Sequence, residues 1–161
     1  MQKFRILEQP QLVEPLAREL VERLAPFQPT VVVSAAVGGI VLGYETARQL
    51  GTKAIFVEKD GGVPTLRRGF AIGPGDRALV VEDVVTTGRS VREVLDVVRA
   101  TGADVVAVGA LVRRAPVDFG VPTAVLLDLP IESFDPPECP LCARGLPLVE
   151  PGSRFTGEPS R

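Results

Sequence analysis

Hydrophobic positions along the chain switch repeatedly between helical and strand spacing. Leucines recur every four residues from Leu12 to Leu24 with other apolar residues beside them, which predicts an amphipathic helix with one buried stripe. Two later helices are each expected to end at a glycine, and short β-branched runs predict buried strands. These patterns predict strands over 30–36, 54–58, 66–72, 78–81, 105–112 and 124–127, and helices over 40–50 and 90–101.

The order of these elements predicts an α/β fold. Strand and helix alternate, so we expect a single domain with a largely parallel sheet flanked by helices. The Gly- and Pro-bearing stretch 59–64 predicts an exposed, mobile loop. Many Pro and Gly residues in the last ~30 positions predict a small irregular hood that ends in a frayed tail. We therefore expect the domain over 1–154 and the tail over 155–161.

Composition narrows the functional class. The chain has 161 residues, of which 45% are hydrophobic and 24% charged, and this balance suits one globular domain. A net charge of −2 argues against a nucleic-acid partner, because such binding needs a basic surface. No window reaches the ~18 apolar residues of a membrane helix, and the first residues lack the apolar stretch of a signal peptide. We therefore expect a cytoplasmic protein with no membrane partner.

The chain contains no histidine, which restricts its chemistry. Ser-His-Asp and Cys-His catalysis are excluded, so carboxylates, Lys, Arg, hydroxyls, backbone amides or a borrowed cation must act. The two cysteines, Cys139 and Cys142, form a C-P-L-C pair without a third Cys or His to complete a zinc site within one chain. Reduced thiols in a Pro-rich turn are favoured, while a redox pair or a zinc ion shared across a dimer stays open.

The stretch 79–90, LVVEDVVTTGRS, carries the candidate chemistry. An apolar strand delivers Glu82 and Asp83 at its carboxyl end, where open α/β sheets bind ligands. Residues 86–90 then place hydroxyls and a glycine at the start of a helix, whose free N–H groups and dipole favour a phosphate. Carboxylates beside a phosphate cradle suit a sugar phosphate, because the acids can accept hydrogen bonds from ribose hydroxyls. A plain helix cap next to a solvated acidic pair is the alternative.

This stretch resembles the PRPP-binding signature of type I phosphoribosyltransferases. The resemblance implies that the acidic pair holds the ribose hydroxyls of PRPP and that the following loop holds its 5-phosphate. It also implies a pyrophosphate loop after the first strand, although the small residues there equally suit a tight turn. The PRPP-binding residues expected on this basis are Glu82, Asp83, Val84, Val85, Thr86, Thr87, Gly88, Arg89, Ser90, Ser34, Ala35, Ala36, Val37, Gly38, Lys59, Arg67 and Arg68.

A third element, KDGGVPTLRRGF over 59–70, is similar to the corresponding stretch of short bacterial and archaeal orotate phosphoribosyltransferases. So is the carboxy-terminal C-P-L-C-x-x-G-x-P-L-x-x-P-G-S-R over 139–154. The resemblance implies a lid whose cations close over the leaving diphosphate, with Lys59 and Asp83 as the catalytic residues. A solvated hairpin with ordinary surface charges is the alternative.

The resemblance further implies that the chain joins orotate to PRPP, giving orotidine 5'-phosphate and diphosphate in pyrimidine biosynthesis. Thr86 and Arg114 are the expected orotate-binding residues. The family places an Asp-Arg pair where this chain has Arg113 and Arg114, so an arginine replaces the aspartate. The resemblance also implies Mg²⁺ bound through PRPP rather than by protein side chains, and a homodimer. A purine phosphoribosyltransferase and a non-catalytic PRPP-sensing regulator remain as alternatives.

Overall fold

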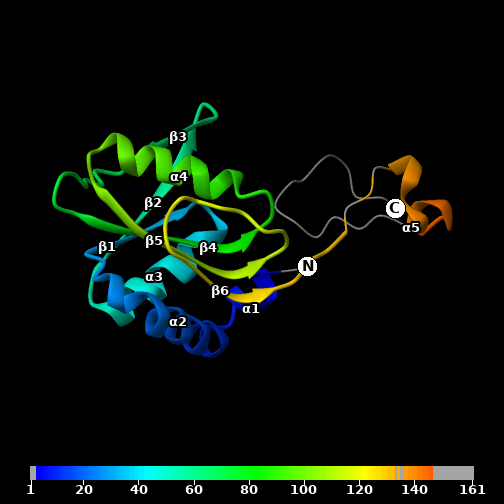
Figure 1. Cartoon of the computed structure of the whole chain (residues 1–161), viewed down its shortest axis with the longest axis horizontal. Coiled ribbons are helices and arrows are strands. Elements are labelled where there is room, and N and C mark those ends of the chain that lie inside the picture. The colour runs from blue at the N-terminus through cyan, green and yellow to red at the C-terminus, as the bar shows by residue number, and fades with distance from the viewer. Residues whose placement is uncertain (1–2, 133, 135, 147–161) are drawn as a thin grey trace. The chain divides into compact units, whose positions relative to one another are not determined.

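In a computed structural model, which describes residues 3–132, 134 and 136–146, six strands form one sheet. All neighbouring strands are parallel except the pair at one edge, so the expected α/β fold with a largely parallel sheet is confirmed (Figure 1). The strands are β1 (Val31–Ala35), β2 (Lys53–Asp60), β3 (Val63–Leu66), β4 (Arg77–Val85), β5 (Asp104–Arg113) and β6 (Thr123–Asp128), in the spatial order β3-β2-β1-β4-β5-β6.

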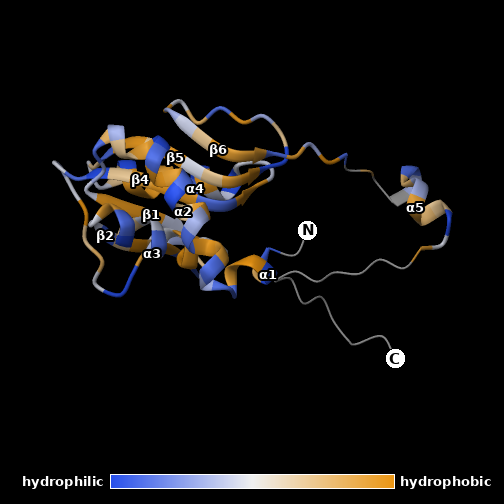
Figure 2. Cartoon of the chain, turned by 90° about the horizontal axis from the view of Figure 1, so that it is seen from below, coloured by the Kyte–Doolittle hydropathy of each residue, from blue (hydrophilic) through white to orange (hydrophobic). Residues whose placement is uncertain are grey.

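Helices cover both faces of this sheet (Figure 1). Strand residues alternate between two apolar cores. Val31 and Val33 belong to the core that includes the helix over 89–100, and Val32 belongs to the core that includes the helices over 10–24 and 38–50. The central strands are therefore apolar on both faces, as Figure 2 shows for β1, β4 and β5. The helices are α1 (Phe4–Leu7), α2 (Pro10–Leu24), the short 3₁₀ turn η1 (Ala25–Phe27) and α3 (Gly38–Leu50) on one face, and α4 (Arg89–Ala100) on the other.

The buried stripe of α2 is confirmed in part. Leu20 and Leu24 are buried, and so are Val13 and Ala17, two of the apolar residues expected beside the leucines. Leu12, in contrast, is 41% exposed. A helix has 3.6 residues per turn, so a strict four-residue repeat drifts away from the core within three turns.

The stretch 59–64, expected as a mobile loop, is the tip of a β-hairpin. β2 and β3 pair in antiparallel fashion up to Gly61 and Gly62, whose φ angles of 55° and 89° suit a two-residue turn. Pro64 is tolerated in β3 because that strand lies at the edge of the sheet. The tip is therefore an ordered hairpin.

Two strand boundaries also differ from expectation. The strand expected over 66–72 is wrong, since Arg68 and Gly69 have φ angles of 59° and 74° that end the extended chain after Leu66. β4 runs further than expected and includes Glu82 and Asp83 within the strand. The carboxylates are therefore fixed by the sheet itself.

Residues 131–146 belong to a separate unit and contain η2 (Pro136–Glu138) and α5 (Pro140–Ala143). Cys139 and Cys142 are free thiols, and backbone N–H groups of Cys142 and Leu141 lower the pKa of Cys139. The described residues hold no cluster of three or more metal-ligating side chains and no helix fit to cross a membrane. The hood stays a prediction, and the tail over 155–161 lies outside the described residues.

Candidate active site

The carboxyl ends of β1 and β4 meet at one edge of the sheet. The two strands are parallel neighbours, and Ser34 lies opposite Val81. The loop after β1 is thus placed beside the acidic pair of β4, where open α/β sheets bind ligands.

The loop after β1 lies directly against these acids. A Cβ atom at Gly38 would stand 2.5 Å from Oδ2 of Asp83, so only glycine permits the approach. The peptide bond between Ala36 and Val37 in this loop is cis. Ser34 is buried beneath the loop, and its side chain faces α3, where a Cβ at Gly43 would stand 2.9 Å from Ser34 Oγ.

The acidic pair is almost fully buried, with Glu82 7% and Asp83 1% exposed. Burial, together with the neighbouring Asp83 charge, raises the pKa of Glu82 to about 8. The Lys3 ammonium lies 2.9 Å from Oδ2 and 3.0 Å from Oδ1 of Asp83. Asp83 is therefore paired with a cation, while burial disfavours the charged form of Glu82.

The loop between β4 and α4 is held in shape by side chains outside it. Gly88 has φ 76°, and a Cβ there would stand 2.7 Å from Cγ1 of Val117. Arg92 donates to the backbone oxygens of Thr87 at 3.0 Å and Asp118 at 3.3 Å. Because α4 begins directly after Gly88, its free N–H groups and positive dipole end lie at this loop and favour an anion.

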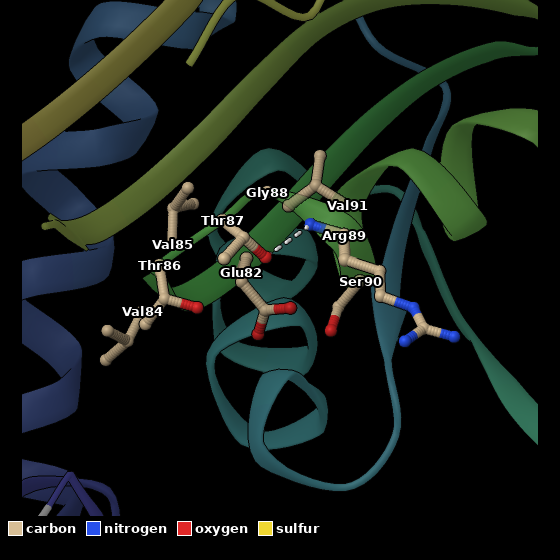
Figure 3. A pocket seen from close by; sticks show the side chains of 9 residues that line it. All are labelled: Glu82, Val84, Val85, Thr86, Thr87, Gly88, Arg89, Ser90 and Val91. Carbon is tan, nitrogen blue, oxygen red and sulfur yellow. Dashed lines mark hydrogen bonds between the residues drawn. The ribbon is translucent and has the colours of Figure 1, made fainter. Parts of the chain in front are cut away.

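A hollow opens beside Glu82 at this loop (Figure 3). Figure 3 shows the Glu82 carboxylate between the side chains of Thr86 and Ser90, while the Arg89 side chain points away from it. Hydroxyls and a helix start can hold a phosphate here while the carboxylate reaches an attached sugar. The lining residues are Glu82, Val84, Val85, Thr86, Thr87, Gly88, Arg89, Ser90 and Val91.

A second hollow adjoins the first, since Ser90 lines both. It brings together the loop after β1, the β2–β3 hairpin and α4. Lys59 therefore lies beside the loop expected to hold diphosphate. The lining residues are Ala35, Ala36, Val57, Glu58, Lys59, Pro64, Ser90, Glu93 and Val94.

The two arginines after β3 are tied to acids of the hairpin. Arg68 lies 3.0 Å from Glu58, and Arg67 lies 3.5 Å from Asp60 and 3.9 Å from Glu58. Within the described part of the chain, neither arginine lines the two hollows. They lie at the base of the hairpin, outside both spaces.

Arg113 and Arg114, at the end of β5, make different contacts. Arg113 makes a two-point ion pair with Asp128, at 2.7 and 3.1 Å, because the two residues lie opposite each other on β5 and β6. Arg114 donates its backbone N–H to Val85 at 2.8 Å, next to the phosphate loop. Its Nε is buried and has no hydrogen-bond partner among the described residues. Arg114 thus keeps a donor available for a ligand.

Comparison with known proteins places this chain in a family. The family model of the phosphoribosyl transferase domain matches residues 5–117. The chain is 48% identical over 156 residues to an orotate phosphoribosyltransferase of Caldanaerobacter subterraneus, covering 96% of this chain and 82% of that protein. It is 50% identical over 151 residues to one of Pelotomaculum thermopropionicum, covering 92% and 80%. The chain belongs to the phosphoribosyltransferase family.

Solved phosphoribosyltransferases have the same fold. An orotate phosphoribosyltransferase from Aeropyrum pernix matches with a TM-score of 0.64 at 23% identity, over 78% of this chain and 76% of that one. An adenine phosphoribosyltransferase from Rhodothermus marinus matches with a TM-score of 0.64 at 28% identity, over 77% and 83%. Fold alone therefore does not separate the two bases.

Three residues around this candidate site were not expected from the sequence. Lys3 contacts Asp83 across 80 positions of the chain, so no local pattern could reveal it. Asp128 pairs with Arg113 through the register of β5 and β6. Glu93 follows Arg89 by four positions, the spacing at which helical side chains meet. The ion pair of these two residues could therefore have been predicted from the sequence.

Proposed function

We propose that this chain is an orotate phosphoribosyltransferase, which transfers the phosphoribosyl group of PRPP to orotate and releases diphosphate. The observation that carries the proposal is the pair of buried carboxylates next to a hydroxyl- and glycine-bearing loop at the start of α4. The choice of orotate is supported by relatives of that name at 48% and 50% identity.

The reaction can run on positioning and electrostatics. A bond forms from the orotate ring nitrogen to C1 of the ribose while the bond from C1 to the diphosphate oxygen breaks, so positive charge grows on the sugar. Glu82 and Asp83 hold the ribose hydroxyls, and the start of α4 holds the 5-phosphate. Orotate is already a nucleophile in its anionic form, so a chain without histidine needs no strong base.

Magnesium is the cofactor that we expect. The two carboxyl groups offer the oxygen donors that Mg²⁺ takes, and Oδ2 of the buried Asp83 already faces a cation, the Lys3 ammonium at 2.9 Å. A bound Mg²⁺ would be held chiefly by oxygens of PRPP beside Glu82 and Asp83. It would supply positive charge that offsets the charge of the leaving diphosphate.

The base is expected to lie between the phosphate loop and the end of β5. Arg114 keeps a buried Nε without a partner among the described residues, and a guanidinium suits the orotate carboxylate. Thr86 lies on the loop beside it and offers a hydroxyl. Arg113 is engaged by Asp128, so we assign it to holding the end of β5.

We further propose that the enzyme works in the cytoplasm as a homodimer. Lys59 lies on the hairpin and Asp83 on β4, so they can be disabled separately, and Lys59 lines the second hollow with Ala35 and Ala36 of its own chain. Mixing Lys59→Ala with Asp83→Asn chains should therefore restore no activity after verified subunit exchange. Recovery of part of the activity would show that Lys59 reaches the neighbouring subunit's site instead.

The test of the reaction is a base panel. The chain is incubated with PRPP, Mg²⁺ and, in turn, orotate, adenine, hypoxanthine, xanthine and uracil, and diphosphate release is followed. We expect orotate to be turned over fastest. Faster turnover of a purine would make the chain a purine phosphoribosyltransferase, and PRPP binding without any turnover would make it a regulator.

A further inference from the structure

Glu93 on α4 joins two cations from different parts of the site. The Lys59 ammonium lies 2.9 Å from its Oε2 and 3.2 Å from its Oε1. Nε of Arg89 donates to the same Oε1 at 3.0 Å. One carboxylate therefore links the lid hairpin to the first residue of the helix that follows the phosphate loop.

This contact lies at the wall of the second hollow. Lys59 and Glu93 line it together with Ala35 and Ala36, which belong to the loop expected to hold diphosphate. Lys59 stands on β2, where the strand holds its backbone, but its side chain is long and 54% exposed. Without a partner such a side chain would sample many rotamers.

The ion pairs of Glu93 with Lys59 and Arg89 are less exposed at the carboxylate than an ordinary surface pair. Arg18 and Glu14 on α2 are four positions apart, as Arg89 and Glu93 are on α4, and their side chains are 59% and 50% exposed. Glu93 is only 22% exposed and is shared by two cations. The hydrogen bond from Lys59 is the main cause that lowers the pKa of Glu93, so the carboxylate stays charged at neutral pH.

We propose that Glu93 is a positioning residue, which holds the Lys59 ammonium at the mouth of the diphosphate loop before the substrate arrives. The inference rests on the proposed function, since it assigns a task to the lid lysine of that reaction. As the diphosphate leaves and gains charge, its oxygens replace the carboxylate as the partner of Lys59. Loss of Glu93 therefore leaves Lys59 present but without the partner that orients its side chain.

Glu93→Gln keeps the size of the side chain and removes its charge. We expect kcat to fall about 10-fold, because a misplaced catalytic group loses much of its effect. The KM for orotate should stay within about 2-fold, since its contacts lie at the other end of the site. The Tm should change little, as for other partly exposed ion pairs. Glu14→Gln is the matched control and should leave kcat unchanged.

A double-mutant cycle separates an action through Lys59 from a direct one. In a Lys59→Ala background, adding Glu93→Gln should cost nothing further in kcat. In an Arg89→Ala background, the same substitution should still cost about 10-fold. An unchanged kcat in Glu93→Gln alone, or an equal loss with and without Lys59, would overturn the positioning role.

The cycle also distinguishes this inference from the choice of base. It is run with whichever base the wild-type chain turns over, so a purine in place of orotate leaves the test standing. Rescue of kcat to within about 3-fold by Glu93→Asp, which restores the charge, supports the role. No turnover with any base would overturn the proposed function and this inference together.

Discussion

The phosphate loop between β4 and α4 is held by Arg92 and packs closely on Val117. The β2–β3 hairpin, in contrast, is joined to α4 by the ion pair of Lys59 and Glu93, whose side chains are 54% and 22% exposed. The loop offers backbone and hydroxyl groups whose geometry is set before any ligand arrives. The hairpin offers the Lys59 ammonium, whose present partner is the Glu93 carboxylate, which phosphate oxygens can replace. The rigid region suits the 5-phosphate, which does not react, and the exchangeable region suits the leaving diphosphate.

Loss of the charged acid next to the rigid loop should have the largest effect. Asp83→Asn keeps the size of the side chain but removes the charge that faces Lys3 and that we propose holds the ribose. We expect kcat/KM to fall by ~10²-fold or more, as for lost transition-state stabilisation. Steady-state kinetics on a variant with unchanged far-UV circular dichroism measures it. Wild-type turnover from this variant would contradict the role given to the acidic pair.

Disturbing the rigid loop should act on PRPP binding. Gly88→Ala puts a Cβ 2.7 Å from Val117 at a φ of 76°, so the loop must shift. We expect the KM for PRPP to rise about 10-fold and the stability to fall by about 1–2 kcal/mol.

Gly51→Ala provides the control for this strain. Gly51 has a φ of 68° but no atom within 4 Å of an added Cβ. It should lose a similar amount of stability, measured by urea unfolding, and keep the KM for PRPP. Equal KM values in Gly88→Ala and the wild-type chain would remove the distinction between the two regions.

Loosening the hairpin should reduce turnover and hardly affect stability. Arg68 is 61% exposed and pairs with Glu58, and exposed pairs of this kind contribute only about 0.2–1 kcal/mol. We expect Arg68→Ala to lower kcat about 3-fold through a less well-placed hairpin, with a Tm change of no more than about 4 °C. Arg18→Ala, which breaks the pair with Glu14, should leave kcat unaltered. A large loss of Tm in Arg68→Ala would show that the hairpin is part of the rigid framework.

The smallest expected effect is on stability as a function of pH. Burial raises the pKa of Glu82 from 4.5 to about 8, so between these values the folded chain binds a proton that the unfolded chain has released. Stability should therefore fall as pH rises through this window. Glu82→Gln should show a smaller fall and a Tm at least about 2–4 °C above that of the wild-type chain at pH 9.

The matched variant for this comparison is Glu22→Gln, at an exposed position of α2. It should follow the wild-type curve of Tm against pH, recorded by calorimetry. Parallel curves for Glu82→Gln and the wild-type chain would mean that Glu82 keeps an ordinary carboxyl pKa.

The rigid region could be predicted from the sequence better than the hairpin. Strands and helices around the phosphate loop follow from apolar spacing, and the acid pair with its Thr-Thr-Gly-Arg-Ser loop lies within one short stretch. The hairpin was only the alternative to a mobile loop, because Gly61 and Gly62 suit a loop as well as a tight turn. Pro64, moreover, is tolerated in a strand only at an edge that the sequence does not reveal.

Contacts between distant parts of the chain could not be predicted from local sequence patterns. The ion pair of Lys3 with Asp83 depends on how α1 meets the sheet, and that of Arg113 with Asp128 depends on strand register. Ser34 was expected at the ligand because of its place in the loop, yet the pleat of β1 turns its side chain toward α3.

A direct competition between bases tests the central claim. Wild-type chain is given PRPP, Mg²⁺ and equal amounts of orotate and adenine in one reaction, and the nucleotides formed are identified by mass spectrometry, with the Asp83→Asn chain as the blank. We predict that orotidine 5'-phosphate accumulates with an equal amount of diphosphate and that the blank yields almost none. Accumulation of AMP instead, or the same yield from the blank, would contradict the account.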